Sequence, residues 1–275
     1  MKLGIIQMEI TTDKENNMKK ALSEIRSLSE KGADIVILPE MFNCPYNMNF
    51  FSQYAEPSEG KCWSLLAKAA KENNIYLIAG SIPEIDDQGN IYNTSYIFDR
   101  NGLEIGKHRK IHLFDINVQG GQRFMESAVL TAGDKVTIFD SEFCRIGVAI
   151  CYDYRFPELT RLMVDQGAKI IIIPAAFNMT TGPAHWELLF RQRAVDNQVF
   201  SIGVAPSRDY NASYVSYGNS IVVSPWGEVL LRLGEEEASV VIDIDLAMVD
   251  KVRAELPLLK HRRHDLYKLI DNKNP

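Results

Sequence analysis

The chain lacks the sequence features of several large protein classes. Its 275 residues include four cysteines, none in a CxxC pair, and His108 and His112 stand four residues apart without a third metal ligand. No apolar run approaches the about 18 residues that a membrane-spanning helix needs, and no GxGxxG or Walker pattern is present. The net charge of −6 would repel a phosphate backbone. We therefore expect no metal, no cofactor, no nucleic-acid partner and no membrane partner.

The remaining composition is that of a globular protein with a large core. Hydrophobic residues make up 46% of the chain, and its length suits one large domain or two ordinary ones. The apolar run at the N-terminus ends at Glu9, which is too short for the hydrophobic region of a signal peptide. We therefore expect a cytoplasmic protein with free thiols and a small-molecule substrate as its partner.

Two segments of the chain repeat each other. Residues 32–39 read GADIVILP and residues 167–174 read GAKIIIIP, and each segment follows an amphipathic helical pattern. Weaker parallels continue downstream and end in two predicted hairpins, with turns at residues 99–102 and 224–227. The chain therefore reads as two fused copies of one α/β unit, related by a pseudo-twofold duplication.

The first long helix is marked at both ends. Residues 12–15 have the spacing of a capping box, apolar residues recur at helical intervals from Met18 to Leu28, and Gly32 ends the pattern. A single apolar face predicts that this helix covers one side of a sheet.

The strand patterns predict how the layers are stacked. Residues 170–173 are apolar at every position, which is typical of a sheet that is buried on both faces. Two such sheets packed face to face, with helices outside, give an α/β fold: a four-layer α-β-β-α sandwich. We predict that it forms one domain over residues 1–275.

The alternative is a pair of separate doubly wound domains. That arrangement needs a linker between about Arg109 and Val136. Because this stretch contains Phe114, Phe124 and Met125 among its charged residues, we favour the sandwich.

Three polar groups stand at the ends of apolar, strand-like runs. Glu40 follows Pro39, Lys110 lies in the basic stretch of residues 107–112, and Cys151 precedes a turn. Taken alone, each has a plain alternative: a surface glutamate, a solvated lysine and a buried structural cysteine. Together, a carboxylate, an ammonium group and a thiol at one sheet edge can act as base, oxyanion clamp and nucleophile in amide hydrolysis.

The turn after Cys151 is predicted to lead into a helix. The dipole of that helix would favour a thiolate at its N-terminus, and the backbone N–H of Tyr152 would point at a developing oxyanion. The pattern therefore predicts a nucleophile lifted into a cleft, with an oxyanion donor beside it.

These motifs resemble those of a known family. Residues 38–40 (LPE), 109–112 (RKIH) and 149–153 (AICYD) look like the Glu-Lys-Cys motifs of the nitrilase, or carbon-nitrogen hydrolase, superfamily. The resemblance covers nearly the whole chain, and it implies the four-layer sandwich and a homodimer.

The resemblance also implies a role for each residue of the motifs. Glu40 would be the general base, Lys110 would stabilise the tetrahedral intermediate, and Cys151 would be the nucleophile that forms a thioester. Glu126 would be the second glutamate, which orients the site.

The expected substrate follows from a closer resemblance inside the superfamily. Residues 111–116, 124–127, 181–189 and 193–198 are most similar to the omega-amidases, which hydrolyse the terminal amide of 2-oxoglutaramate and 2-oxosuccinamate. Such a substrate needs a cationic pocket for its far carboxylate, and Arg155 is the first candidate. The alternative for Arg155 is a salt bridge at the surface or at a dimer interface.

Four further residues are candidates for substrate binding, because the matching loops border the pocket in the family: Tyr46, Phe177, Thr180 and Thr181. Residues 117–123 depart from the family pattern, so the choice of substrate at this loop is less specified than the chemistry.

Other functions remain open at this point. The same chemistry would serve an amidase of deaminated glutathione or an N-carbamoyl amidohydrolase. A family member without catalysis would use the same cleft to bind a metabolite or a partner protein. The complete set of Glu40, Lys110 and Cys151 argues against that last reading, because a binding protein needs neither a nucleophile nor a clamp.

Overall fold

The computed structural model describes residues 1–273 as a mixed α/β fold with two large sheets. The eight strands of the first sheet are β1 (Lys2–Gln7), β2 (Ile35–Ile37), β3 (Glu56–Pro57), β4 (Tyr76–Ile78), β5 (Ile82–Ile85), β6 (Ile91–Phe98), β7 (Glu104–Arg109) and β16 (Ala238–Asp243). The six strands of the second are β10 (Thr137–Asp140), β11 (Arg145–Val148), β12 (Ile170–Pro174), β13 (Phe200–Val204), β14 (Ile221–Val223) and β15 (Val229–Arg232).

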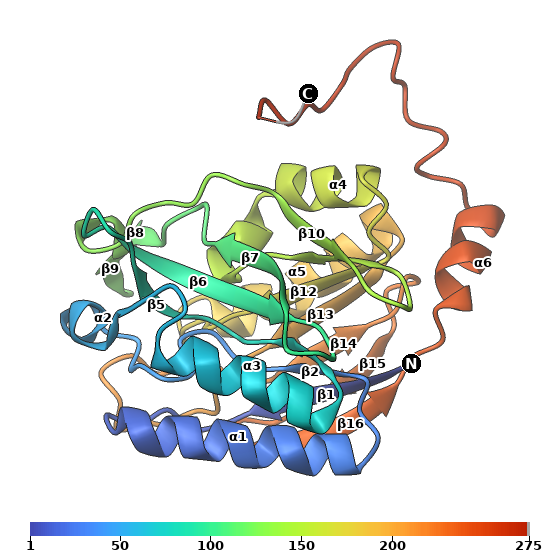
Figure 1. Ribbon diagram of the computed structural model, residues 1–275. Coiled ribbons are helices and arrows are strands. Elements are labelled where there is room, and N and C mark those ends of the chain that lie inside the picture. The colour runs from blue at the N-terminus through green and yellow to red at the C-terminus, as the bar shows by residue number, and fades with distance from the viewer. Residues whose placement is uncertain (274–275) are drawn as a thin grey trace.

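Helices cover the outer faces of both sheets. Figure 1 shows α1 and α3 side by side on one outer face and α4 and α5 on the opposite side. The α-helices of the described residues are α1 (Lys14–Glu30), α2 (Met48–Tyr54), α3 (Lys61–Asn73), α4 (Pro157–Asp165), α5 (Gly182–Asn197) and α6 (Ala247–Glu255). Two short 3₁₀ helices, η1 (Glu126–Ala128) and η2 (Cys151–Arg155), and a small hairpin of β8 (Asp115–Asn117) and β9 (Arg123–Met125) complete the structure.

The alternation of side chains along the strands produces the four layers. In β2, Ile35 and Ile37 point to the space between the sheets, whereas Val36 packs with the helices outside. In β12, Ile172 points inward and Ile171 outward in the same way. Strands that are apolar at every position therefore bury both faces, and the predicted α-β-β-α sandwich is confirmed.

The two sheets share one order of strand pairing. In the first, β1, β2 and β4 are parallel, and β6 and β7 follow as antiparallel strands. In the second, β11, β12 and β13 are parallel, and β14 and β15 follow as antiparallel strands. This order is compatible with the predicted duplication, which stays a prediction.

The stretch between the two large sheets is not a linker. Phe114 and Phe124 are buried in one apolar cluster with Tyr46 and Tyr214, which lie far away in the sequence. The side chains between the sheets likewise come from both halves of the chain. The structure therefore contradicts the alternative of two separate doubly wound domains joined by a linker.

The predicted hairpin turns agree with the structure, whereas the start of α1 is shifted by one residue: its N-cap is Asp13 and not Thr12, so the capping box of residues 12–15 does not form. Asp13 caps α1 by accepting a hydrogen bond from the backbone of Asn16 at 3.0 Å, and Gly32 beyond its end has a φ of +83° that favours glycine. The turns at residues 99–102 and 224–227 join β6 to β7 and β14 to β15.

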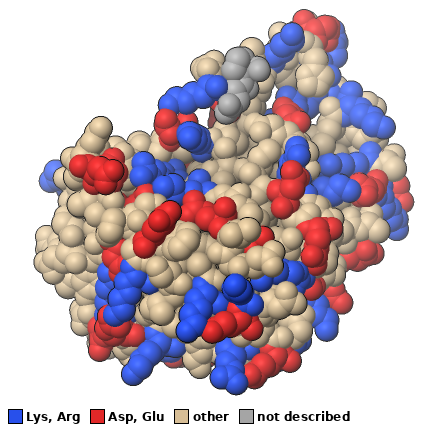
Figure 2. Space-filling model, in the orientation of Figure 1, with Lys and Arg blue, Asp and Glu red and all other residues tan. Residues whose placement is uncertain are grey.

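The helices of the described residues do not indicate a membrane-spanning segment. None of the helices in residues 1–273 has the length and apolarity needed to span a bilayer. Basic and acidic side chains are interspersed over the face seen in Figure 2. After α6, residues 257–273 form neither helix nor strand, and Figure 1 shows them running over the side of the molecule that carries α4.

Candidate active site

The four residues that carry the predicted chemistry come together at one edge of the sheets. Glu40 follows β2, Lys110 follows β7, Glu126 opens η1 and Cys151 opens η2. Glu40, Lys110 and Glu126 are fully buried, and Cys151 is 4% exposed. A loop-borne set of polar groups is thus held in the interior, where each group needs a partner.

Lys110 is the centre of this cluster. Its Nζ lies 2.9 Å from Glu126 Oε1, 3.1 Å from Glu40 Oε1 and 3.2 Å from the hydroxyl of Tyr46. Burial lowers the pKa of Lys110, but the two carboxylates outweigh burial and raise it above its ordinary value. Lys110 is therefore a fixed positive charge at neutral pH.

Both oxygens of the Glu40 carboxylate are held by donors. Besides Lys110, Oε1 accepts from Asn93 Nδ2 at 2.8 Å, and Oε2 accepts from the backbone N–H of Ala176 at 2.7 Å. Burial raises the pKa of Glu40; Lys110 opposes this rise and Glu126 adds to it. The net direction is upward, which brings the carboxyl group closer to the proton affinity that suits a base and acid at neutral pH.

Cys151 lies in a strained backbone conformation within reach of Glu40. Its φ is +48°, in the left-handed region that a residue with a β-carbon rarely adopts. The thiol lies near the Glu40 carboxylate, and of the two groups only the thiol can donate a hydrogen bond while Glu40 is ionised. Burial and then the charge of Glu40 raise the pKa of Cys151 well above its ordinary value.

The resting group is therefore a thiol and not the thiolate that a helix N-terminus would favour. The helix that begins at Cys151 is a single 3₁₀ turn of five residues, so its dipole is small beside the cost of burying a charge. The arrangement instead suits a base that removes the thiol proton as the sulfur attacks.

Tyr152 is the second residue of η2. The first N–H groups of a helix have no partner inside the helix, and the role of the Tyr152 N–H as an oxyanion donor stays a prediction.

Tyr46 lies inside the cluster and not at its border. Its hydroxyl contacts Glu126 Oε1 at 2.5 Å and Glu40 Oε1 at 3.2 Å. A phenol has one proton to donate, and both acceptors here belong to the cluster. The structure therefore places this predicted substrate-binding residue where it orients the two carboxylates.

Arg155 and Phe177 lie side by side, and their role as walls of a substrate pocket stays a prediction. The guanidinium is 4.7 Å from the centre of the Phe177 ring, and its Nη1 donates to His185 Nδ1 at 3.0 Å. The ion pairs of residues 1–273 include none that involves Arg155, so the expected alternative of a salt bridge within the chain is not seen. Burial lowers the pKa of Arg155, and the group remains a cation.

The two predicted threonines lie further out. Thr180 is exposed, and the hydroxyl of Thr181 donates to Asn178 Oδ1 at 3.0 Å. Asn178 in turn donates through its Nδ2 to the side-chain oxygen of Gln122, which lies in the loop that departs from the family pattern. The structure therefore connects these threonines to that loop and not to the buried cluster.

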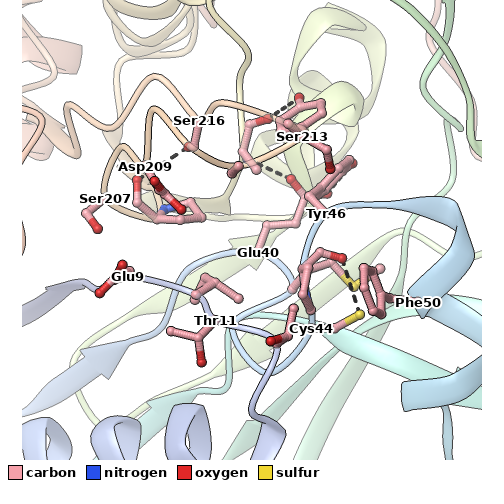
Figure 3. Close-up of a pocket in the computed structure, with 18 of the residues that line it drawn as sticks. Glu9, Thr11, Glu40, Cys44, Tyr46, Phe50, Ser207, Asp209, Ser213 and Ser216 are labelled. Carbon is pink, nitrogen blue, oxygen red and sulfur yellow. Dashed lines mark hydrogen bonds between the residues drawn. The ribbon is translucent and has the colours of Figure 1, made fainter.

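A cavity of about 380 Å³ lies on the side of the cluster formed by Glu40 and Tyr46. Figure 3 shows these two residues between the loop that carries Ser213 and Ser216 and the segment that carries Thr11. The other polar residues that line the cavity are Glu9, Thr12, Ser207, Asp209 and Asn211. Neither Cys151 nor Arg155 is among the residues that line this cavity.

A buried carboxylate that sequence reasoning did not single out joins the lysine to the cysteine. Asp153 accepts from His108 Nε2 at 2.9 Å, from His112 Nδ1 at 2.8 Å and from the backbone of Ile150 at 3.1 Å. Burial alone would raise the pKa of Asp153, but the histidine hydrogen bonds outweigh it and lower the pKa. The two histidines therefore flank Lys110 and fasten it to the turn that carries Cys151.

Three further contributors to the site were missed. They are the side chain of Asn93, the backbone N–H of Ala176, and Tyr214, whose ring lies 4.6 Å from that of Tyr46. The repeated pattern around residues 93–102 marked Asn93 as part of a hairpin only. A backbone N–H leaves no trace in a sequence.

Comparison with known proteins gives a consistent picture. A model of the carbon-nitrogen hydrolase family matches residues 2–254. The chain is 48% identical to omega-amidase NIT2 of Xenopus tropicalis over 273 residues, which are 99% of each chain, and 48% identical to omega-amidase NIT2 of Homo sapiens over 274 residues. The human match covers 100% of this chain and 99% of the relative.

Solved structures show the same fold. The crystal structure of Saccharomyces cerevisiae Nit3, a member of branch 10 of the nitrilase superfamily, superposes with a TM-score of 0.88 at 39% identity and covers 96% of both chains. The similarity extends over nearly the full length in each comparison.

Proposed function

This chain belongs to the carbon-nitrogen hydrolase family, and we propose that it is an omega-amidase, which hydrolyses the terminal amide of a short oxo-dicarboxylate and releases ammonia. The observation that carries the proposal is the buried cluster in which Lys110 lies between Glu40 and Glu126, with the Cys151 thiol beside Glu40. Relatives named omega-amidase, 48% identical over nearly the whole chain, support 2-oxoglutaramate and 2-oxosuccinamate as substrates.

The first half of the reaction forms a thioester. Glu40 takes the proton of the Cys151 thiol while the sulfur attacks the amide carbonyl, so that a C–S bond forms and the carbonyl oxygen becomes an oxyanion. Lys110 and the N–H of Tyr152 stabilise this oxyanion, each by about 3 to 4 kcal/mol. Glu40 then gives its proton to the leaving nitrogen, the C–N bond breaks, and ammonia departs.

The second half regenerates the thiol. Glu40 takes a proton from water as the water oxygen attacks the thioester, and the second tetrahedral intermediate is held by the same donors. When the C–S bond breaks, Glu40 returns a proton to the sulfur and the dicarboxylate is released. One carboxyl group therefore serves as base and as acid, which fits a raised pKa.

Glu126 and Tyr46 hold Lys110 and Glu40 in position through hydrogen bonds. Glu126 Oε1 accepts from Lys110, and its Oε2 accepts from the backbone of Phe114. This carboxylate is therefore fixed to the chain, and it fixes the ammonium group in turn.

The test of the proposed function is a comparison of substrates. The purified protein should hydrolyse 2-oxoglutaramate, measured as released ammonia, faster than deaminated glutathione, measured as the released amine of cysteinylglycine. It should not hydrolyse an N-carbamoyl amino acid at a comparable rate. A preference for either of the other two would keep the mechanism and change the substrate. No turnover of any amide would favour a protein that only binds.

Replacing Arg155 with alanine is expected to weaken substrate binding selectively. A hydrogen bond to a charged group contributes about 1.5 to 3 kcal/mol, so KM for 2-oxoglutaramate should rise about 10- to 100-fold. KM for a neutral amide of similar length should not change. Arg26→Ala, on the exposed side of α1 where Arg26 pairs with Glu30, is the matched control. Equal effects on both substrates would exclude Arg155 as the carboxylate site.

We further propose that the enzyme acts as a cytoplasmic homodimer. The resemblance to the family supports the dimer, and so do the exposed apolar side chains of Leu188 and Trp226, which line one hollow between α5 and the turn after β14. Sedimentation should show a species of two 31.1 kDa chains.

A further inference from the structure

Asn93 touches both sides of the Glu40–Lys110 pair. It lies in β6, fully buried, and its Nδ2 donates to Glu40 Oε1 at 2.8 Å. Its backbone carbonyl accepts from the backbone N–H of Lys110 at 2.9 Å. No other side chain in residues 1–273 donates an amide N–H to this carboxylate.

The other end of the same side chain has no partner. The carbonyl oxygen of Asn93 is buried, and it accepts no hydrogen bond from any group of residues 1–273. The amide cannot turn over to satisfy this oxygen, because its carbonyl would then face the Glu40 carboxylate. A buried acceptor without a donor weakens a fold, so an apolar side chain of similar shape, such as leucine, would avoid this cost. The contact with Glu40 is what an asparagine offers here and a leucine does not.

We propose that Asn93 is a positioning residue whose side-chain amide holds Glu40 in its ionised, proton-accepting form between turnovers. The inference rests on the proposed function, in which Glu40 is the base. An N–H that points at a carboxylate oxygen stabilises the carboxylate and not the carboxylic acid. Asn93 therefore works against burial and against the neighbouring Glu126, both of which favour a protonated Glu40.

The lysine, the thiol and the two phenols around Glu40 do not titrate in the same range as a carboxyl group. Lys110 stays positive, while burial first of all raises the pKa of the Cys151 thiol and of the phenols of Tyr46 and Tyr214 above their ordinary values. The charged and titratable groups that face Glu40 are Lys110 after β7, Glu126 of η1, Cys151 of η2, Tyr46 before α2 and Tyr214 after β13. The acidic limb of the pH profile therefore reports on the carboxyl groups.

The sign of the expected change follows directly. Without the amide donor, the ionised form of Glu40 is less stable, its pKa rises further, and the base is lost at a higher pH. The acidic limb of kcat/KM should therefore move upward by about one to two pH units, since hydrogen bonds to charged groups are worth that much in proton affinity. At a pH below the new limb, the rate should fall about 10- to 100-fold, and it should recover as the pH rises.

Asn93→Leu and Asn93→Asp test this inference, with Thr94→Val as the matched control. Thr94 is the next residue of β6, is equally buried, and donates at 2.7 Å to Glu84, which pairs with Lys107 and Arg109 away from the cluster. Thr94→Val should lower Tm and leave the pH profile in place. Asn93→Leu should move the acidic limb upward. Its Tm should fall only moderately, because removal of the unpaired carbonyl oxygen offsets part of the loss of the donor to Glu40. Asn93→Asp, which puts a second acceptor against Glu40, should move the limb at least as far.

The outcomes separate the inference from the proposed function. If the wild-type protein releases no ammonia from any amide, the proposed function fails and takes this inference with it. If the wild type is active and Asn93→Leu keeps the wild-type pH profile, the inference alone is wrong. If both Asn93 variants unfold while Thr94→Val folds, the role of Asn93 is structural and the inference is also wrong.

Discussion

Replacing Cys151 with alanine is expected to remove ammonia release almost completely while the fold is kept. Loss of the nucleophile removes the thioester route, and the reduction in kcat should be on the order of 10⁶-fold, as in other enzymes that lose a covalent nucleophile. Alanine is smaller than cysteine and needs no partner, so Tm should stay within a few degrees of the wild-type value. The measurement is ammonia release from 2-oxoglutaramate, together with thermal unfolding of the same sample.

The other thiols supply the control. Cys144, in the turn between β10 and β11, is half-buried, and it belongs to no part of the cluster. Cys144→Ala should keep full activity. Alkylation with iodoacetamide should abolish turnover only when Cys151 is the residue modified, which peptide mapping shows. Activity retained by Cys151→Ala would rule out the thioester route.

Replacing Lys110 with methionine is expected to damage both stability and catalysis. The change leaves the carboxylates of Glu40 and Glu126 buried without their cation, and breaking a buried ion pair from one side costs about 3 to 5 kcal/mol of the free energy of unfolding. It also removes an oxyanion donor, so kcat/KM should fall about 10²- to 10³-fold in the molecules that remain folded.

The loss of stability should depend on pH. Two buried carboxylates without a cation bind protons more tightly when folded than when unfolded, so the folded variant takes up protons that the unfolded chain does not hold. Its stability should therefore be closer to that of the wild type at pH 5 than at pH 8, as urea unfolding at the two pH values would show. Lys107→Met is the control, because Lys107 is half-buried and its partner Glu84 keeps Arg109. A variant at position 110 as stable as this control at pH 8 would contradict the ion-cluster account.

Much of the fold was predictable because burial leaves a periodic signal. The apolar runs at residues 35–37 and 170–173 indicated strands buried on both faces, and two sheets with helices outside are the arrangement that buries them. The pairing of β16 with β1 was not predicted. Antiparallel pairing over about 230 positions in the chain depends on the whole topology and has no local mark.

The site was predictable to the extent that its chemistry lies in side chains at strand ends. Glu40, Lys110 and Cys151 each follow an apolar run, and the resemblance to a family added Glu126. The sequence could not show the hydrogen bonds that connect these residues. Asp153 joins two segments about 40 positions apart, and Asn93 looks like any polar residue of a hairpin. The sequence also left the state of the thiol open, because the burial that raises its pKa is a property of the folded protein.

The reacting groups are divided between the two sheets. Glu40 and Lys110 follow strands of the first sheet, while Cys151 and the N–H of Ala176 follow strands of the second. The exposed tip of the β8–β9 hairpin, near residues 118–121, lies between these two sets in the chain, and β16 from the C-terminal part pairs with β1 from the N-terminal part. Cleavage of the chain at that tip would yield two inactive fragments, each with only part of the reacting groups. Ammonia would be released only after the two fragments associate. Ammonia release would therefore measure the assembly of the two halves of the fold.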